Sequence, residues 1–243
     1  MRAAAVILGI VLLALCGRTP GRLTVGAASN LTTAFDEIGH AFTDETGVEL
    51  VFSYGATSAL ARQVEAGAPL DVFAAADSEH VDALVASGHV MRDTRAVYAR
   101  GQLALWAPGG GVESLQDLAG DGVKFVAIAQ PELAPYGQAA VEALKAAGLW
   151  DAVQPKLVYA NNISQAKQFA MTGNADAALT AYSLVFQEPG TVLVVDAKLH
   201  QALDQAMGVV SGSVHEAAAR QFAAFVKGAR GRAILTKNGY LVK

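Results

Sequence analysis

The sequence predicts an α/β fold of two lobes, each built from a mainly parallel sheet flanked by helices. Short apolar runs, typical of buried strands, alternate with segments whose apolar residues recur at helical spacing. This alternation occurs in two consecutive sets with no flexible linker between them. The chain has 243 residues, 53% hydrophobic and 16% charged, which is enough to bury a large core and too apolar for disorder.

The first set alternates regularly between strands and helices. After an apolar run at residues 23–28, Phe35, Ile38 and Phe42 form one stripe of a helix that ends at Gly47. The expected elements are a strand at 23–28, a helix at 31–46, a strand at 48–53, a helix at 57–66, a strand at 71–76 and a helix at 78–87. This order predicts a parallel sheet with helices on both faces.

The second set is less regular but has the same character. Its expected strands are 102–107, 123–129, 157–159, 177–181, 191–195 and 206–210. Its expected helices are 114–119, 135–147 and 164–171, followed by two C-terminal helices at 215–227 and 231–236. Two such sets predict two lobes joined by crossing strands, with lobe 1 at 21–98 plus 215–243 and lobe 2 at 99–214. Ligands usually lie in the cleft between such lobes.

Residues 1–20 predict a signal peptide or a lipoprotein leader. Arg2 precedes an apolar run at 3–15 that is too short to span a bilayer. A leader that is cleaved near Cys16 predicts export of the protein to the periplasm. A lipoprotein-like box that ends at Cys16 allows a lipid anchor at the outer face of the membrane. A buried N-terminal helix is the alternative interpretation of this run.

Charge and cysteine content exclude several partners. The net charge of −4, with no block of basic residues, argues against nucleic acid and anionic membranes. The one cysteine lies at the edge of the leader, so the folded part has neither a disulfide nor a thiolate metal site. The five histidines lack metal-ligand spacing. We also expect a monomer without a cofactor, a cation site or catalytic residues.

Four strand-to-helix junctions predict an anion site. Ser29 follows the first strand, and Thr57 with Ser58 follows the second. In the second lobe, helices begin near Tyr136 and near Ile163. The first N–H groups of a helix have no intrahelical acceptor and carry the positive end of the helix dipole. Because no Lys or Arg occupies these junctions, the sequence predicts anion binding by neutral donors.

Longer stretches of the sequence carry a family resemblance. They are GAASNLTTAFDEI at 26–38, GATSALARQVEAGAPLDVFAAAD at 55–77, PELAPYGQAAVEAL at 131–144 and NNISQAKQFAMTGNADAALTAYS at 161–183, together with a C-terminal Gly-Tyr at 239–240. With these segments the chain resembles the molybdate-binding protein family, the solute receptors of molybdate ABC transporters. The resemblance implies a two-lobe periplasmic binding protein fold of type II, with molybdate or tungstate as ligand and a membrane permease as partner.

The resemblance also implies ligand residues. Ser29 occupies the position of one hydroxyl donor and Thr57 that of another, with Ser58 beside it. Tyr136 and Ile163 occupy positions that donate backbone N–H groups. The family's fifth contact is a tyrosine phenol, but Ala181 stands at that position here, so either Tyr182 replaces it or the contact is missing.

The chemistry of the junctions agrees with such a ligand. A fully ionised tetrahedral dianion only accepts hydrogen bonds, whereas phosphate keeps a proton near neutrality and favours a site with an acceptor. Sulfate, another proton-free dianion, is an alternative ligand. A periplasmic enzyme on the same fold is an alternative function, although no motif of a hydrolase or nucleotide-binding enzyme occurs. A sensor with the same two lobes is a third alternative.

Overall fold

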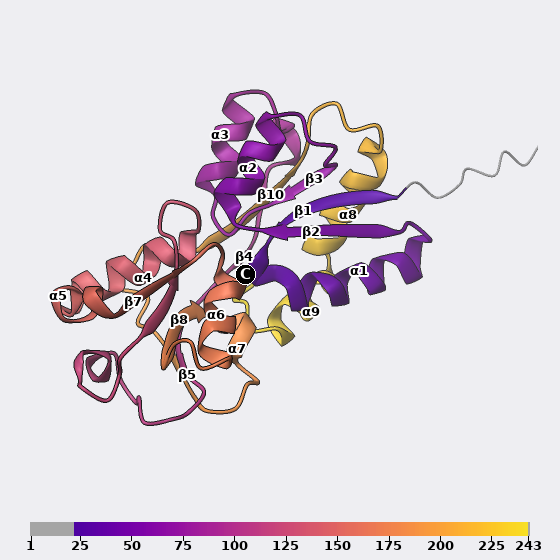
Figure 1. The fold of residues 1–243 in the computed structure, drawn as a ribbon. Helices are drawn as coiled ribbons and strands as arrows, with labels where there is room; N and C mark the ends of the chain where they lie inside the picture. The colour runs from indigo at the N-terminus through magenta and orange to yellow at the C-terminus, as the bar shows by residue number, and fades with distance from the viewer. Residues whose placement is uncertain (1–21, 243) are drawn as a thin grey trace, which may run out of the picture.

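The structure is a computed structural model that describes residues 22–242 (Figure 1). The chain forms two lobes, each centred on a five-stranded sheet. None of the helices within residues 22–242 combines the length and the hydrophobicity of a membrane-spanning segment. The predicted leader at 1–20, with Cys16, lies outside the described residues.

The sheet of lobe 1 joins strands from both ends of the chain. In spatial order it contains β2 (Leu50–Gly55), β1 (Leu23–Ala28), β3 (Val72–Ala74), β10 (Asp204–Val209) and β4 (Ala96–Arg100). β1 is parallel to β2 and β3, while β10 is antiparallel to both of its neighbours. Four of the five strands therefore point the same way, which confirms a mainly parallel sheet.

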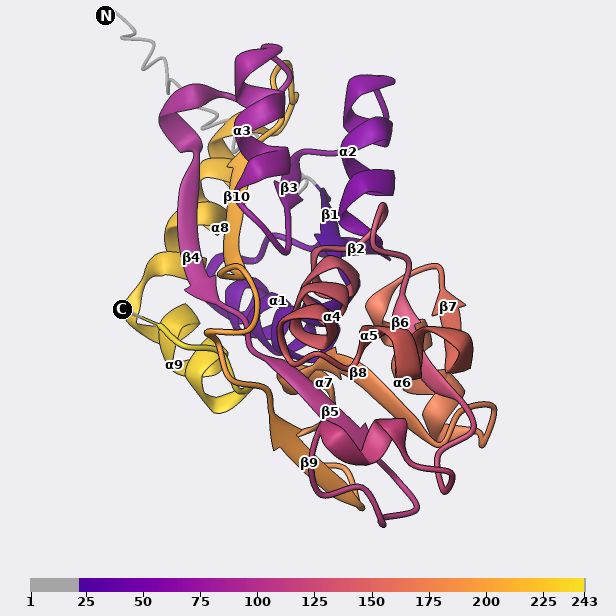
Figure 2. The ribbon, with the colours of Figure 1, turned by 90° about the vertical axis from the view of Figure 1, so that its left-hand side faces the viewer.

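Helices cover both faces of this sheet. They are η1 (Ser29–Leu31), α1 (Thr32–Thr46), α2 (Thr57–Glu65), α3 (Glu79–Ala86), η2 (Arg92–Thr94), α8 (Glu216–Lys227) and α9 (Ala229–Lys237). Alternate residues of β3 face opposite sides, as in any strand. Val72 packs in the cluster of α1 and α8, where Phe35 and Phe42 meet Phe222 edge-on, and Phe73 packs against α2 and α3. Figure 2 shows these two helix layers on either side of the strands.

The sheet of lobe 2 repeats the plan. Its strands, in spatial order, are β7 (Leu157–Ala160), β6 (Val126–Ala129), β8 (Ala177–Ala181), β5 (Leu103–Ala107) and β9 (Thr191–Val194). Here β5 is the one reversed strand. The helices of this lobe are η3 (Gln116–Ala119), α4 (Pro135–Ala146), α5 (Trp150–Val153), η4 (Gln154–Lys156), α6 (Ile163–Met171) and α7 (Tyr182–Val185). Because α4 and α6 connect parallel strands in opposite directions, right-handed crossovers place them on opposite faces.

The chain crosses between the lobes twice, once between β4 and β5 and once between β9 and β10 (Figure 2). The two crossing segments are tied together by the Gly101 N–H, which donates to the Leu203 carbonyl at 2.9 Å. The C-terminus returns beside them, since Arg100 and Leu241 exchange backbone hydrogen bonds of 2.7 and 2.9 Å. Only glycine fits at 101, because an added Cβ would lie 2.0 Å from the Tyr136 hydroxyl.

The sheet membership differs from the predicted lobe division at both boundaries of lobe 2. The predicted lobe 2 at 99–214 includes β10, but β10 pairs with β3 and β4 in the sheet of lobe 1. The second crossing therefore comes before Asp204. The first crossing comes after Arg100, because β4 extends beyond the predicted boundary at 98.

Candidate anion site between the lobes

Four strand-to-helix junctions, two from each lobe, meet at one hollow between the lobes. They are β1 to η1, β2 to α2, β6 to α4 and β7 to α6. The hollow is small, with a volume of about 10 Å³, and is lined by Ala28, Ser29, Asn30, Gly55, Ala56, Thr57, Ala76, Ala134, Pro135, Tyr136 and Ile163. The structure thus brings together Ser29, Thr57, Tyr136 and Ile163, as the sequence predicts.

Ser29 offers the first side-chain donor. It begins η1 directly after β1 and is 4% exposed. Its hydroxyl donates to Asn162 Oδ1 at 3.4 Å and accepts from the Ser164 N–H at the same distance. Both bonds are long for a hydroxyl group. The hydroxyl hydrogen can therefore turn toward a better acceptor, such as an anion oxygen, and only a weak hydrogen bond is lost.

Thr57 offers the second side-chain donor. It is the first residue of α2 and is 1% exposed. The Ala76 N–H donates to Thr57 Oγ1 at 3.2 Å, which fixes the hydroxyl oxygen and leaves its hydrogen free. A hydroxyl group can donate one bond while accepting another. Thr57 is therefore held as a donor at the edge of the hollow.

The second lobe contributes backbone donors. Tyr136 is the second residue of α4, after Pro135, and Ile163 is the first residue of α6. Their N–H groups precede the first intrahelical acceptor, so the helices do not use them. Gly137 lets α4 begin close to β6, since an added Cβ would lie 2.2 Å from the Ala129 carbonyl oxygen. The start of α4 is thereby fixed against the end of a central strand.

The lining carries no charged side chain: none of the residues around the hollow is Asp, Glu, Lys or Arg. Positive potential comes instead from the ends of the helices, whose dipoles point at the hollow. Such an arrangement suits a dianion, because neutral donors can bind it without a carboxylate that repels it. No group of His, Cys, Asp and Glu that could hold a metal ion occurs within residues 22–242.

Two lining residues carry buried polar atoms that have no hydrogen-bond partner in the described part of the chain. They are Asn30 Oδ1 and the Tyr136 hydroxyl. Asn30 Nδ2 donates to Gln205 Oε1 at 2.8 Å and to the Tyr240 hydroxyl at 2.9 Å, which fixes the orientation of the amide. Burial raises the pKa of the Tyr136 phenol, so it stays protonated. The sequence analysis did not include Asn30, because an asparagine at a helix start reads as an ordinary cap.

Ser58 lies next to Thr57 but does not line the hollow. Its hydroxyl lies 3.0 Å from His80 Nε2 and donates to the Glu132 carbonyl at 3.0 Å. Its N–H donates to the Leu133 carbonyl at 3.1 Å. The structure therefore assigns Ser58 to the contact between the lobes.

Tyr182 also lies outside the lining of the hollow. It begins α7, and its N–H donates to the Gln102 carbonyl at 2.9 Å. Its ring packs against Phe186, with 5.7 Å between ring centroids, and against Gly239, where an added Cβ would lie 2.9 Å from it. Ala181 is fully buried at the end of β8 and does not line the hollow either. The structure does not bring either candidate for a fifth contact to the four junctions.

Comparison with known proteins identifies the family. The family model for bacterial extracellular solute-binding proteins matches residues 23–241. The molybdate-binding protein ModA of Rhodobacter capsulatus is 33% identical over 100% of this chain and 97% of its own length. ModA of Azotobacter vinelandii is 33% identical over 97% of this chain and 95% of its own length. The chain belongs to the molybdate-binding protein family.

A solved structure from this family has the same fold as this chain. The periplasmic molybdate-binding protein of Azotobacter vinelandii superposes with a TM-score of 0.88 at 30% identity, covering 91% of this chain and 99% of that one. This likeness confirms the predicted two-lobe periplasmic binding protein fold. The family consists of extracellular solute-binding proteins, and the matched structure is described as periplasmic.

Proposed function

We propose that this protein captures molybdate or tungstate outside the cytoplasm and delivers it to the permease of an ABC transporter. The observation that carries the proposal is the convergence of four helix starts from two lobes on one hollow without charged side chains. The names of the relatives support the same ligand class. In this proposal Ser29 and Thr57 donate hydroxyl hydrogens, and Tyr136 and Ile163 donate backbone N–H groups.

Selectivity follows from the donor set. Near neutral pH phosphate carries a proton that needs an acceptor, and the lining holds no carboxylate. Sulfate carries no proton, so it is rejected by its smaller size. The protein needs no resident cofactor, and it binds its ligand without converting it.

A calorimetric titration of the exported, mature protein tests the proposal. We expect tight binding of molybdate and tungstate and much weaker binding of sulfate and phosphate. Equal affinity for phosphate and molybdate would contradict the neutral-donor argument. Tight sulfate binding with weak molybdate binding would show that the protein has the same fold but carries a different oxyanion.

The route of the protein is part of the same proposal. Export through the leader at 1–20 places the protein in the periplasm, or on the outer face of the membrane if Cys16 is lipidated. Mass spectrometry of the mature N-terminus distinguishes these two forms. A mature chain that retains residues 1–20 would contradict export by this leader.

A further inference from the structure

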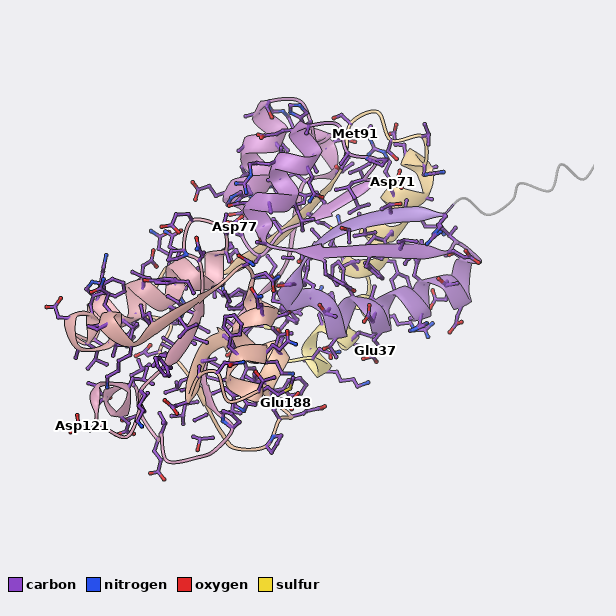
Figure 3. All side chains as sticks on the ribbon, viewed as in Figure 1. Glu37, Asp71, Asp77, Met91, Asp121 and Glu188 are labelled. Atoms are coloured by element: carbon purple, nitrogen blue, oxygen red, sulfur yellow. The ribbon has the colours of Figure 1, made fainter. Side chains whose placement is uncertain are left out.

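Asp77, His80 and Ser58 form a hydrogen-bonded chain at the edge of lobe 1. His80 Nδ1 lies 2.7 Å from Asp77 Oδ2, and His80 Nε2 lies 3.0 Å from Ser58 Oγ. The backbone N–H of His80 also donates to Asp77 Oδ1 at 3.1 Å, so the carboxylate caps the start of α3 and holds the ring. Figure 3 labels Asp77 at the end of lobe 1 that faces α4 of lobe 2.

This chain continues into the other lobe. Ser58 is 8% exposed and bonds to two carbonyl groups of the loop between β6 and α4, at Glu132 and Leu133. The same loop leads directly to Tyr136 at the candidate anion site. A change in the bonds of Ser58 therefore acts on the contact between the lobes and on one of the four junctions.

The number of available hydrogens determines which protonation state of His80 satisfies all the contacts seen with the lobes together. The Asp77 carboxylate only accepts, so His80 Nδ1 carries a hydrogen. If Nε2 is bare, it needs the single hydrogen of the Ser58 hydroxyl, and the Glu132 carbonyl loses its donor. If Nε2 is protonated, it donates to Ser58 Oγ, and the hydroxyl donates onward to Glu132. All three contacts are satisfied only when the imidazole is positively charged.

The charged groups around His80 favour that form. The hydrogen bond to Asp77 raises the pKa of His80 above its ordinary value, and the charges of Asp77 and Glu79 act in the same direction. Burial and the charge of Arg62 on α2 oppose this rise. From lobe 2, Glu142 on α4 lines the same groove as Asp77 and Glu79, and Glu132 lies in the loop that Ser58 contacts.

Hydrogen bonds that run from Asp to His to Ser also link the three residues of a serine hydrolase triad. Two observations assign a different role here. Both hydrogen-bonding groups of Ser58 are engaged with lobe 2, and Ser58 lines neither the anion hollow nor the groove beside Asp77. The side chain is placed to hold the two lobes together.

We propose that Asp77, His80 and Ser58 form a proton-dependent latch that holds the lobes closed while His80 is charged. The latch then makes oxyanion binding tighter at low pH and weaker at high pH, a consequence that rests on the proposed function. The sign follows from linkage: closure gives the Ser58 hydroxyl hydrogen to the Glu132 carbonyl, which leaves a bare His80 Nε2 without a donor and so favours the charged imidazole. Closure is therefore favoured below the open-state pKa of His80, and the effect is lost as pH rises through the closed-state pKa.

Calorimetric titration with molybdate between about pH 6 and pH 9, on either side of the ordinary histidine pKa, tests the latch. The wild-type affinity should fall about three- to tenfold over this range, the equivalent of one hydrogen bond. Ser58→Ala should bind weakly with no such dependence. His80→Ala should also lose the dependence but bind at least as tightly as wild type at high pH, because Ser58 keeps its hydrogen for Glu132.

His215→Ala is the matched control. His215 is also bonded to an aspartate of lobe 1, with 3.2 Å from its Nδ1 to Asp71 Oδ1. Asp71 lies at the other end of that lobe from Asp77 (Figure 3). This variant should keep the wild-type pH profile. A flat wild-type profile, or a His80→Ala profile as steep as that of wild type, would overturn the latch.

Small-angle scattering without ligand separates the latch from the proposed function. The ligand-free wild type should expand as pH rises, and Ser58→Ala should be expanded at every pH. If no variant binds molybdate but this expansion is seen, the latch stands and the proposed ligand fails. If molybdate binds but neither affinity nor size depends on pH, the latch fails alone.

Discussion

Ser29 and Ser164, 135 residues apart, are bonded to each other across the cleft by two hydrogen bonds. The Ser164 hydroxyl donates to the Ser29 carbonyl at 2.9 Å, and the Ser164 N–H reaches the Ser29 hydroxyl at 3.4 Å. Ser29 belongs to lobe 1 and Ser164 to the first turn of α6 in lobe 2. A residue proposed to bind the anion is thus also part of the contact that closes the lobes, so ligand binding and closure share one side chain.

Removal of either proposed hydroxyl donor should weaken molybdate binding. Loss of a hydrogen bond to a charged group costs about 1.5–3 kcal/mol, or roughly 10- to 150-fold in affinity. We expect Ser29→Ala and Thr57→Ala to fall in this range by calorimetry. Thr43→Ala, which removes a hydroxyl bonded to the Val48 carbonyl at the other end of α1, should bind like wild type. Wild-type affinity in both site variants would place the site elsewhere.

Tyr136→Phe should stabilise the protein and leave ligand affinity within about twofold, since the proposed donor is the backbone N–H. The Tyr136 hydroxyl is buried without a partner within residues 22–242, and such a group costs about 1–3 kcal/mol. We expect urea unfolding to show a gain of about 1 kcal/mol. Tyr98→Phe is the contrasting control, because the buried Tyr98 hydroxyl donates to the Ala75 carbonyl at 3.2 Å. A loss of stability in both variants would show that the Tyr136 hydroxyl has a partner.

Tyr182→Phe should bind molybdate with unchanged affinity. The ring of Tyr182 packs against Phe186 and Gly239, away from the residues that line the hollow. Calorimetry and ligand-induced compaction in small-angle scattering should both match wild type. Weaker binding together with less compaction would instead support a phenol contact from lobe 2.

Gly137→Ala should reduce both stability and affinity. An added Cβ would lie 2.2 Å from the Ala129 carbonyl oxygen, so the start of α4 must move away from β6. Overpacking of this kind costs about 1–3 kcal/mol, and it displaces the Tyr136 N–H. Gly122→Ala is the control, because nothing lies within 4 Å of its added Cβ. Unchanged molybdate affinity in Gly137→Ala would show that the N–H of Tyr136 is not a donor.

The alternation of strands and helices was predictable because it depends on local spacing. The strand at 177–181 has the predicted bounds, and the predicted helix at 135–147 is observed as Pro135–Ala146. The sequence analysis missed β4, because its apolar run, residues 96–99, is only four residues long between Arg95 and Arg100. It placed β10 in the wrong sheet, because periodicity identifies a strand but not its neighbours.

The candidate site was predictable to the same degree. Helix starts can be located from caps and strand ends, so the four junctions were found before their convergence was known. The contact of Ser58 with His80 was not, since the two residues are 22 apart and neither carries a motif. The position of Tyr182 depends on how α7 packs against Gly239, a tertiary contact that no local pattern encodes.

Lobe 2 is inserted within the sequence of lobe 1. This insertion determines the order in which the two sheets of a newly synthesised chain can be completed. Lobe 2 is one continuous stretch, so its sheet can close as soon as β9 has emerged. One edge of β3 in lobe 1 stays open until β10 arrives, after the whole of lobe 2. Pairing β3 with β10 closes a long loop, which makes it a slow, non-local step. Since the anion site is lined by residues of both lobes, it cannot be complete before both lobes have formed.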